Sequence, residues 1–186
     1  MEKLLWVDLE TEGLYPHPPT GHRIFEFGMA ITDLNLKKLD EAAWQVWYPN
    51  FEPSECDEFI QNMHTKNGLF IDMKGKGLYL EDLSREVLGT LDLWDVPLDR
   101  TMPVHGNSLR LDREFISVHL PELDSKLSYR IVDVSSFKET CRRFKPDLYA
   151  AYLDFYPDDD KAHRVLSDID HSISEYKFYL EGMGWL

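Results

Sequence analysis

The chain has 186 residues, of which 43% are hydrophobic and 13% aromatic, so it can bury a core and is not a disordered tail. Its net charge of −14, from 34 acidic and 20 basic residues, argues against a protein that grips long polyanions through many Lys and Arg contacts. A nucleic-acid substrate stays compatible with this charge if it is short and held by metal ions and a few local contacts.

The cellular setting follows from what the sequence lacks. The apolar stretch Leu4–Val7 is too short for a signal-peptide core, and no later run approaches the length of a membrane span. Cys56 and Cys141 show neither a metal-ligand spacing nor a disulfide framework. We therefore expect a single domain over residues 1–186, in the cytoplasm and without membrane association.

The first third of the chain predicts three consecutive strands. Apolar and β-forming residues mark these strands at 4–9, 23–33 and 42–48. Turns are expected over Pro16–Gly21 and Leu34–Asp40.

Two helices are predicted next, at 55–63 and 80–93. Asp82 is a candidate cap of the second helix, and Pro97 lies just past its end. The segment Lys66–Gly77 between the helices is rich in Gly and Lys, so we expect it to be mobile.

Strands and helices alternate in the second half. The expected elements are strands at 102–105 and 130–134, a helix that follows Gly106-Asn107-Ser108 to about Leu120, and a helix at 135–144. Pro146–Asp160 is expected to be irregular or only partly helical. The last helix has the clearest pattern, because five apolar residues step by four, four, three and four positions: Val165, Ile169, Ile173, Tyr176 and Leu180. This order predicts an α/β fold with a mixed sheet.

Two acids stand out on the first strand. Asp8 and Glu10 are two residues apart, so both side chains leave the same face while Leu9 points the other way. The apolar run before them predicts a buried central strand, and acids that emerge from such a strand need a neutralising partner. A solvated strand end also carries such pairs, so the pattern alone leaves that reading open.

A second acidic feature lies near the C-terminus. His163 precedes Asp168 by five residues, which places them about 140° apart on a continuous helix, so they would not share a face. If His163 lies in the loop before the helix, it can reach over while Asp168 projects inward from the first turns. The alternative is a surface acid that the helix dipole favours. Asp112 lies one turn into its helix and is unremarkable alone.

Together these spacings resemble the oligoribonuclease family of DEDD exonucleases, histidine subtype. That family has Asp-x-Glu on its first strand, an Asp in mid-chain and His-x4-Asp near the C-terminus. Five segments carry the likeness in the family's order: Asp8–Leu14, His64–Leu69, Gly106–Asp112, Tyr129–Ser135 and Ala162–Ile169. The resemblance runs from residue 4 to about 180 and implies a ribonuclease H-like fold, with a mixed central sheet flanked by helices.

The resemblance implies a 3′→5′ exoribonuclease that hydrolyses short single-stranded RNA, down to dinucleotides, to 5′-mononucleotides. Asp8, Glu10, Asp112 and Asp168 would hold two divalent cations, Mg²⁺ or Mn²⁺, with Asp8 as the bridging ligand. His163 would be the general base that deprotonates the attacking water. The alternative for His163 is a surface histidine before a helix.

The resemblance also suggests residues that bind the substrate. Leu14 would wedge between two bases, Phe59 would stack on a base, and His64 and Ser108 would contact the oligonucleotide. A buried helix residue is the rival reading for Phe59, and a satisfied loop histidine is the rival for His64.

A third group matches residues that, in the family, come from a second subunit and cap the 5′ phosphate. These residues are Tyr129, Arg130 and Ser135. They imply a homodimer, for which composition and periodicity give no independent sign.

The chain also departs from the family pattern. Glu12 replaces the usual Thr, residues 15–22 differ, Leu109-Arg110-Leu111 stands in place of I-G-Q, and the Gly/Lys loop at 74–77 is unusual. These departures leave open the substrate length and the choice between RNA and DNA. An exonuclease acting on single-stranded DNA is therefore the enzymatic alternative, and a non-catalytic nucleotide-binding module is a third reading.

Overall fold

The centre of the fold is a five-stranded mixed sheet. The computed structural model describes residues 2–19, 21–156 and 162–186. Its strands are β1 (Leu4–Thr11), β2 (Ile24–Thr32), β3 (Lys38–Gln45), β4 (Val104–Gly106) and β5 (Ile131–Asp133). They lie in the order β3-β2-β1-β4-β5, in which β1 is antiparallel to β2 and parallel to β4. The predicted α/β class with a mixed sheet is therefore confirmed.

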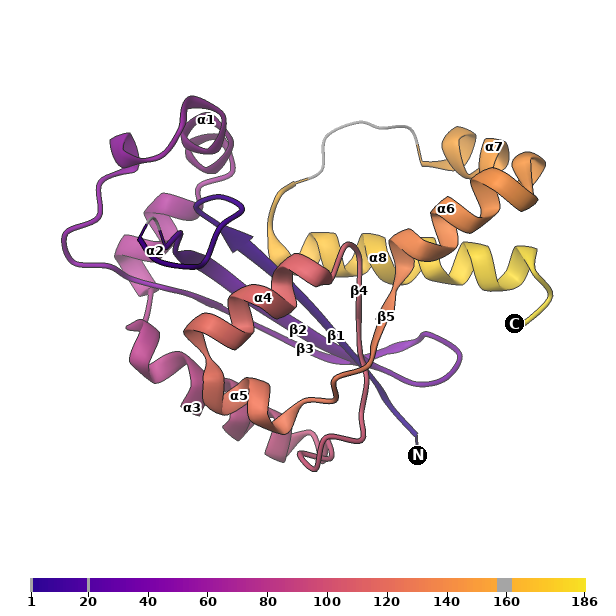
Figure 1. Ribbon diagram of the computed structural model, residues 1–186, viewed down its shortest axis with the longest axis horizontal. Coiled ribbons are helices and arrows are strands. Elements are labelled where there is room, and N and C mark those ends of the chain that lie inside the picture. Colours follow the sequence, from indigo (N-terminus) through magenta and orange to yellow (C-terminus); the bar gives the residue numbers. More distant parts are fainter. Residues whose placement is uncertain (1, 20, 157–161) are drawn as a thin grey trace.

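Helices cover both faces of this sheet. They are α1 (Glu58–Lys66), α2 (Leu69–Lys76), α3 (Leu80–Leu93), α4 (Arg110–His119), α5 (Pro121–Lys126), α6 (Val134–Phe144), α7 (Pro146–Phe155) and α8 (Val165–Gly182), with a 3-10 turn at Pro53–Glu55. In Figure 1, α3, α4 and α5 lie on one side of the sheet, and α8 crosses the other side with α6 and α7 beside it. Within the described ranges, no helix has both the length and the apolar character needed to cross a bilayer.

The two faces of β1 have different surroundings. Leu5 and Val7 belong to the core beneath α3, α4 and α5, whereas Trp6 packs in a second core against α8. Because side chains alternate along a strand, Asp8 and Glu10 leave β1 on the same face as Trp6. Both acids therefore lie on the side of the sheet that α8 covers.

Gly28 on β2 lets α8 come close to the acids. It is paired with Asp8 in the antiparallel register. A Cβ added at Gly28 would lie 2.5 Å from the Cβ of Val165, the first residue of α8. Only a residue without a side chain allows this approach, so the start of α8 lies directly over the acidic end of β1.

Several predicted boundaries differ from the structure. β3 begins at Lys38, so the predicted turn Leu34–Asp40 is too long and the strand predicted at 42–48 starts too late. α1 begins three residues later than predicted. The N-cap of α3 is Tyr79, whereas Asp82 lies in its first turn, where an acid interacts favourably with the helix dipole.

Two helices, α2 and α5, were not predicted, and a third, α7, was predicted only in part. α2 occupies most of the stretch Lys66–Gly77, which was expected to be mobile, because Leu69 and Met73 lie one turn apart and bury against Phe25. α7 covers Pro146–Phe155 of the segment Pro146–Asp160, which was expected to be irregular or only partly helical; residues 157–160 lie outside the described ranges. α5 begins at Pro121, which ends α4 and at the same time occupies the first turn of the next helix.

Candidate active site

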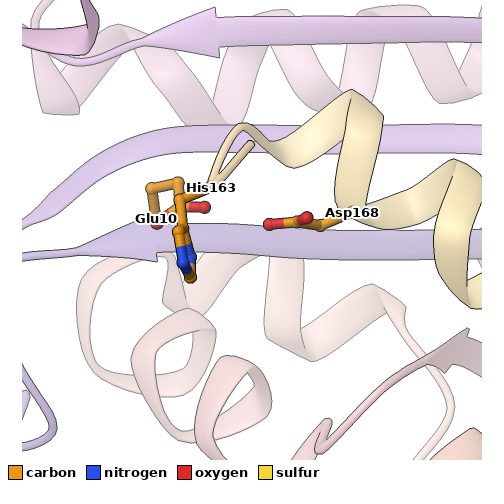
Figure 2. Close-up of side chains that lie close together, drawn as sticks. All are labelled: Glu10, His163 and Asp168. Carbon is orange, nitrogen blue, oxygen red and sulfur yellow. The ribbon is translucent and has the colours of Figure 1, made fainter. Parts of the chain in front are cut away.

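Three side chains from distant parts of the chain meet at the end of β1. Figure 2 shows Glu10 on β1, His163 in the segment before α8, and Asp168 reaching toward them from the first turn of α8. One ligand-type atom from each residue lies within 4.8 Å of the other two. His163 thus precedes the helix and Asp168 faces inward, which is the arrangement that their five-residue spacing requires.

A cavity of about 260 Å³ opens at this cluster. Its walls come from β1, the loop before α4, the segment before α8, and α8 itself. The lining residues are Asp8, Leu9, Glu10, Asn107, Ser108, His163, Asp168, His171 and Ser172. Of the predicted metal and catalytic residues, all except Asp112 line this single cavity.

Asp112 is placed behind β1. It lies in the first turn of α4, and its Oδ1 accepts a hydrogen bond of 3.1 Å from the backbone N–H of Leu9. Because Leu9 separates Asp8 from Glu10, this bond holds the carboxylate of Asp112 against the backbone of β1 between the two predicted ligands, close enough to Glu10 to raise its pKa. The structure therefore brings all four predicted carboxylates to one end of β1, three of them in the cavity wall.

The electrostatics of the site are those of crowded buried acids. Burial raises the pKa of Glu10, and the neighbouring Asp168 and Glu26 raise it further. Burial also raises the pKa of Asp112. A carboxylate whose ionised form is disfavoured by burial and like charges is stabilised by a cation bound between the acids. The donor set, made of carboxylate oxygens with one imidazole, suits a hard divalent cation.

The predicted substrate residues Leu14 and Phe59 have exposed side chains. Leu14 is 62% exposed just after β1, and Phe59 is 69% exposed on α1. Phe59 is thus not the buried helix residue of the alternative reading. Both side chains are free to meet a ligand, and their contacts with bases stay a prediction.

His64 is placed differently from Leu14 and Phe59. Its side chain is fully buried, and its Nε2 lies 3.7 Å from Oε2 of Glu10 without a hydrogen-bond partner among the described residues. Burial lowers the pKa of His64 to about 4. His64 therefore lies behind Glu10, and a direct contact with substrate would require it to move.

Tyr129, Arg130 and Ser135 form a separate group beside β5. The guanidinium of Arg130 lies 4.9 Å from the centre of the exposed Tyr129 ring. The hydroxyl of Ser135 donates to Oδ1 of Asp133, which also accepts from the backbone N–H of Ser108. None of the three is among the residues that line the cavity of their own chain. This placement leaves room for the expected action on a second subunit and does not test it.

The departures from the family pattern have local explanations. Glu12 forms an ion pair with Arg23, with Oε2 3.1 Å from Nε, so its charge is not left facing the cavity. Leu109 is fully buried in the core beneath the sheet, and Arg110 pairs with Glu114 on the surface of α4.

Three polar lining residues were not predicted as site residues from the sequence: Asn107, His171 and Ser172. Asn107 donates from its amide to the buried Glu175 at 2.9 Å. His171 and Ser172 follow Asp168 by three and four residues and so share its helix face. The helical period could have identified them, had it been applied to the polar face of α8 as well as to its apolar stripe.

A family model described as exonuclease (RNase_T) matches residues 5–176. Curated relatives are similar over almost the whole chain. An oligoribonuclease of Corynebacterium diphtheriae is 37% identical over 179 residues, which are 96% of this chain and 81% of the relative. An oligoribonuclease of Vibrio parahaemolyticus is 35% identical over 181 residues, covering 97% of this chain and 94% of the relative.

Solved structures of exonuclease I share the fold. The zinc-bound complex of E. coli exonuclease I with single-stranded DNA matches with a TM-score of 0.71 at 14% identity, over 98% of this chain and 41% of that one. Exonuclease I from Methylocaldum szegediense matches with a TM-score of 0.67 at 18% identity, over 96% of this chain and 40% of that one. This chain therefore spans about two fifths of the length of these proteins. The match confirms the predicted ribonuclease H-like fold.

Proposed function

This chain belongs to the exonuclease family, and from that premise we propose that it is a 3′→5′ exoribonuclease acting on short oligoribonucleotides. The proposed reaction releases 5′-mononucleotides and continues down to dinucleotides, with residues 1–186 forming one catalytic domain. The observation that carries the proposal is the convergence of Glu10, His163 and Asp168 at one cavity, in a chain 34–37% identical to oligoribonucleases.

The proposed cofactors are two divalent cations, Mg²⁺ or Mn²⁺. Asp8, Glu10, Asp112 and Asp168 would hold them, since their oxygens are hard ligands grouped around one end of β1. Bound cations would supply charge stabilisation for the attacked and leaving oxygens of the phosphodiester. The raised pKa of Glu10 supports this assignment, because its carboxylate is buried among other acids.

His163 is the proposed general base. It lines the same cavity as Asp168 and lies in the segment that precedes α8. An imidazole that faces the scissile phosphate can accept a proton from the attacking water, which leaves hydroxide to attack phosphorus. The carboxylates are poor candidates for this task, because metal binding would occupy their oxygens.

Three exposed side chains are the proposed substrate contacts. Leu14 would lie between bases, Phe59 would stack on one base, and Ser108 at the cavity wall would contact the oligonucleotide. His64 would contribute from behind Glu10, where it limits the movement of that carboxylate.

The proposed assembly is a homodimer in which Tyr129, Arg130 and Ser135 of one subunit cap the 5′ phosphate bound to the other. Arg130 supplies a guanidinium already held against the Tyr129 ring, which suits a terminal phosphate. Such a cap favours very short substrates and agrees with a net charge of −14, which disfavours long polyanions.

Single-stranded DNA is the alternative substrate. One observation favours it, because the solved relatives of the same fold include complexes of exonuclease I with single-stranded DNA. The higher identity to oligoribonucleases favours RNA for this chain.

The proposal is tested by incubating a 5′-phosphorylated diribonucleotide with the protein and Mg²⁺ or Mn²⁺, and by identifying the products by ion-exchange chromatography. We expect mononucleotides from the wild-type chain and none from the Asp168→Asn variant. Asp170→Asn is the matched control, since Asp170 lies on the same helix but pairs with Lys38 on the surface. An intact dinucleotide with wild-type protein, or equal rates with Asp168→Asn, would contradict the proposal, and a matched deoxydinucleotide separates RNA from DNA.

A further inference from the structure

The segment that carries His163 is held in an unusual conformation. His163 has φ +45°, in the left-handed region that residues with a side chain rarely adopt. Such a conformation persists only where neighbouring groups impose it. The contacts that hold this segment therefore also set where the imidazole of His163 points.

Asn67 supplies the first of these contacts. It lies between α1 and α2, about a hundred residues before His163 in the chain. Its Nδ2 donates to the carbonyl oxygen of His163 at 2.6 Å and to that of Ala162 at 3.2 Å. Its Oδ1 accepts from the backbone N–H of Leu69 at 3.0 Å, which fixes the amide at the start of α2.

Arg164 supplies the second contact, on the other side of His163. Its Nη2 lies 2.8 Å from Oε1 of Glu26 and 2.8 Å from Oδ2 of Asp72, and its Nε lies 3.0 Å from Oε2 of Glu26. Glu26 is only 2% exposed, and its Oε2 also accepts from the backbone N–H of Val165. The planar guanidinium thus ties the residue after His163 to both β2 and α2.

Neither Asn67 nor Arg164 lines the cavity. Asn67 donates to the backbone carbonyl groups of Ala162 and His163, and Arg164 pairs with the buried carboxylate of Glu26. The Nδ2 of Asn67 also lies 3.4 Å from Nδ1 of His64, whose Nε2 lies 3.7 Å from Glu10, so the experiment must separate an effect through His163 from one through Glu10. If these contacts were lost, the imidazole of His163 could move away from its position facing Asp168. Misplacement of a reacting group by about 1 Å can slow an enzyme about 100-fold.

We propose that Asn67 and Arg164 are positioning residues that hold His163 in place for proton transfer. The inference rests on the proposed function of His163 as the general base. It assigns the turn between α1 and α2 a new role, in which the segment His64–Leu69 orders the base-bearing loop.

Asn67→Ser is the variant that removes the contacts to the His163 segment most specifically. A serine hydroxyl can still accept from the backbone two residues on, which preserves the local turn before α2. It cannot donate to the carbonyl groups of Ala162 and His163. Arg164→Lys is the second variant, because lysine keeps a positive charge beside Glu26 but loses the fork that reaches Glu26 and Asp72 together. Asn35→Ser, in the exposed turn after β2, is the matched control.

The experiment measures hydrolysis of a 5′-phosphorylated diribonucleotide in two backgrounds, wild type and His163→Ala. In the wild-type background we expect Asn67→Ser to lower kcat about 10- to 100-fold with KM within about two-fold. In the His163→Ala background the same change should lower kcat less than about three-fold, since residues that act through one group are not additive. Equal losses in both backgrounds, or an unchanged kcat, would overturn the proposal.

An NMR measurement separates this inference from the proposed function. In protein with ¹³C-labelled histidine, the Cε1–H signal of His163 is identified by its loss in His163→Ala. We expect Asn67→Ser and Arg164→Lys to broaden, split or shift this signal, and Asn35→Ser to leave it unchanged. A His163 signal identical to that of the wild type in both variants would overturn the positioning role, whether or not the protein hydrolyses RNA. If the wild-type chain leaves the dinucleotide intact while the signal responds as expected, only the proposed function fails.

Discussion

Gly28→Ala is the substitution that most directly probes how α8 is seated on the sheet. The added Cβ would lie 2.5 Å from both Cβ and Cγ2 of Val165 and 3.3 Å from Cδ1 of Ile169. Carbon atoms pack at about 3.5–4.0 Å, so the start of α8 must move by about 1 Å. A rotamer change of Val165 cannot relieve the clash, because its Cβ is fixed by the backbone.

The expected effect on stability follows from this clash. Overpacking a core lowers the free energy of unfolding by about 1–3 kcal/mol, and replacing a strand glycine returns about 0.5–1 kcal/mol of backbone entropy. We expect a net loss of about 1–2 kcal/mol. Gly89→Ala on α3 is the control, since a Cβ there meets nothing within 4 Å, and it should raise stability by about 0.5–1 kcal/mol.

Urea unfolding followed by tryptophan fluorescence measures both changes as shifts of the midpoint at constant slope. The same displacement moves Asp168 in the first turn of α8 and His163 just before it, so Gly28→Ala should also slow dinucleotide hydrolysis about 10-fold or more. Gly89→Ala should leave hydrolysis unchanged. A Gly28→Ala protein with wild-type stability and wild-type activity would refute the reasoning.

The remaining predictions concern metal, base, substrate length and pH. Excess EDTA should abolish hydrolysis and added Mg²⁺ or Mn²⁺ should restore it, because the site is built from carboxylates; full turnover in EDTA would count against this. His163→Ala should lower kcat about 100-fold or more, and an unchanged kcat would remove its assignment as the base. A 5′-phosphorylated dinucleotide should be cleaved faster than a 20-mer, and equal or reversed rates would argue against the phosphate cap. Burial lowers the pKa of His105 to about 4, so this group is neutral when folded but takes up a proton near pH 6.5 when unfolded. Between pH 7.5 and 5 it should therefore remove about 2 kcal/mol of stability, so urea titrations should find that His105→Phe loses about 2 kcal/mol less than the wild type over this range.

The sequence was sufficient to predict the elements with strong periodicity. Val165, Ile169 and Ile173 step at the helical period, and all three are buried in the structure. Asp8 and Glu10 alternate with Leu9, which correctly placed both acids on one face of β1. These patterns are local, because the residues of one helix or strand are enough to show which of its own faces is buried.

The missed features depend on partners far away in the chain. α2 has a short and weakly amphipathic sequence with Gly75 in it, so its stability comes from Leu69 and Met73 packing against Phe25 on β2. The burial of His64 could not be predicted for the same reason, since the group that it faces lies on β1. Resemblance to a family located the residue but not its orientation.

The contacts around Arg164 also join residues that are far apart in the chain, so the sequence alone did not predict them. In the sequence, Glu26 is a single acidic residue in an apolar strand, and Arg164 is a single basic residue after a histidine. Only the fold brings them within 2.8 Å of each other and places Glu26 opposite Glu10 in the sheet. A buried carboxylate in a strand is nevertheless a usable signal, because it requires a cationic partner somewhere in the chain.

The central claim is that carboxylates from β1, α4 and α8 together hold divalent cations at one cavity. Its most direct measurement is the number of Mn²⁺ ions bound per chain, obtained by electron paramagnetic resonance of free Mn²⁺ in the presence of a nucleoside 5′-monophosphate. We expect two ions bound to the wild-type protein and a loss of binding in Asp8→Asn. Binding of Mn²⁺ that is equally tight and equally abundant in Asp8→Asn would contradict the claim.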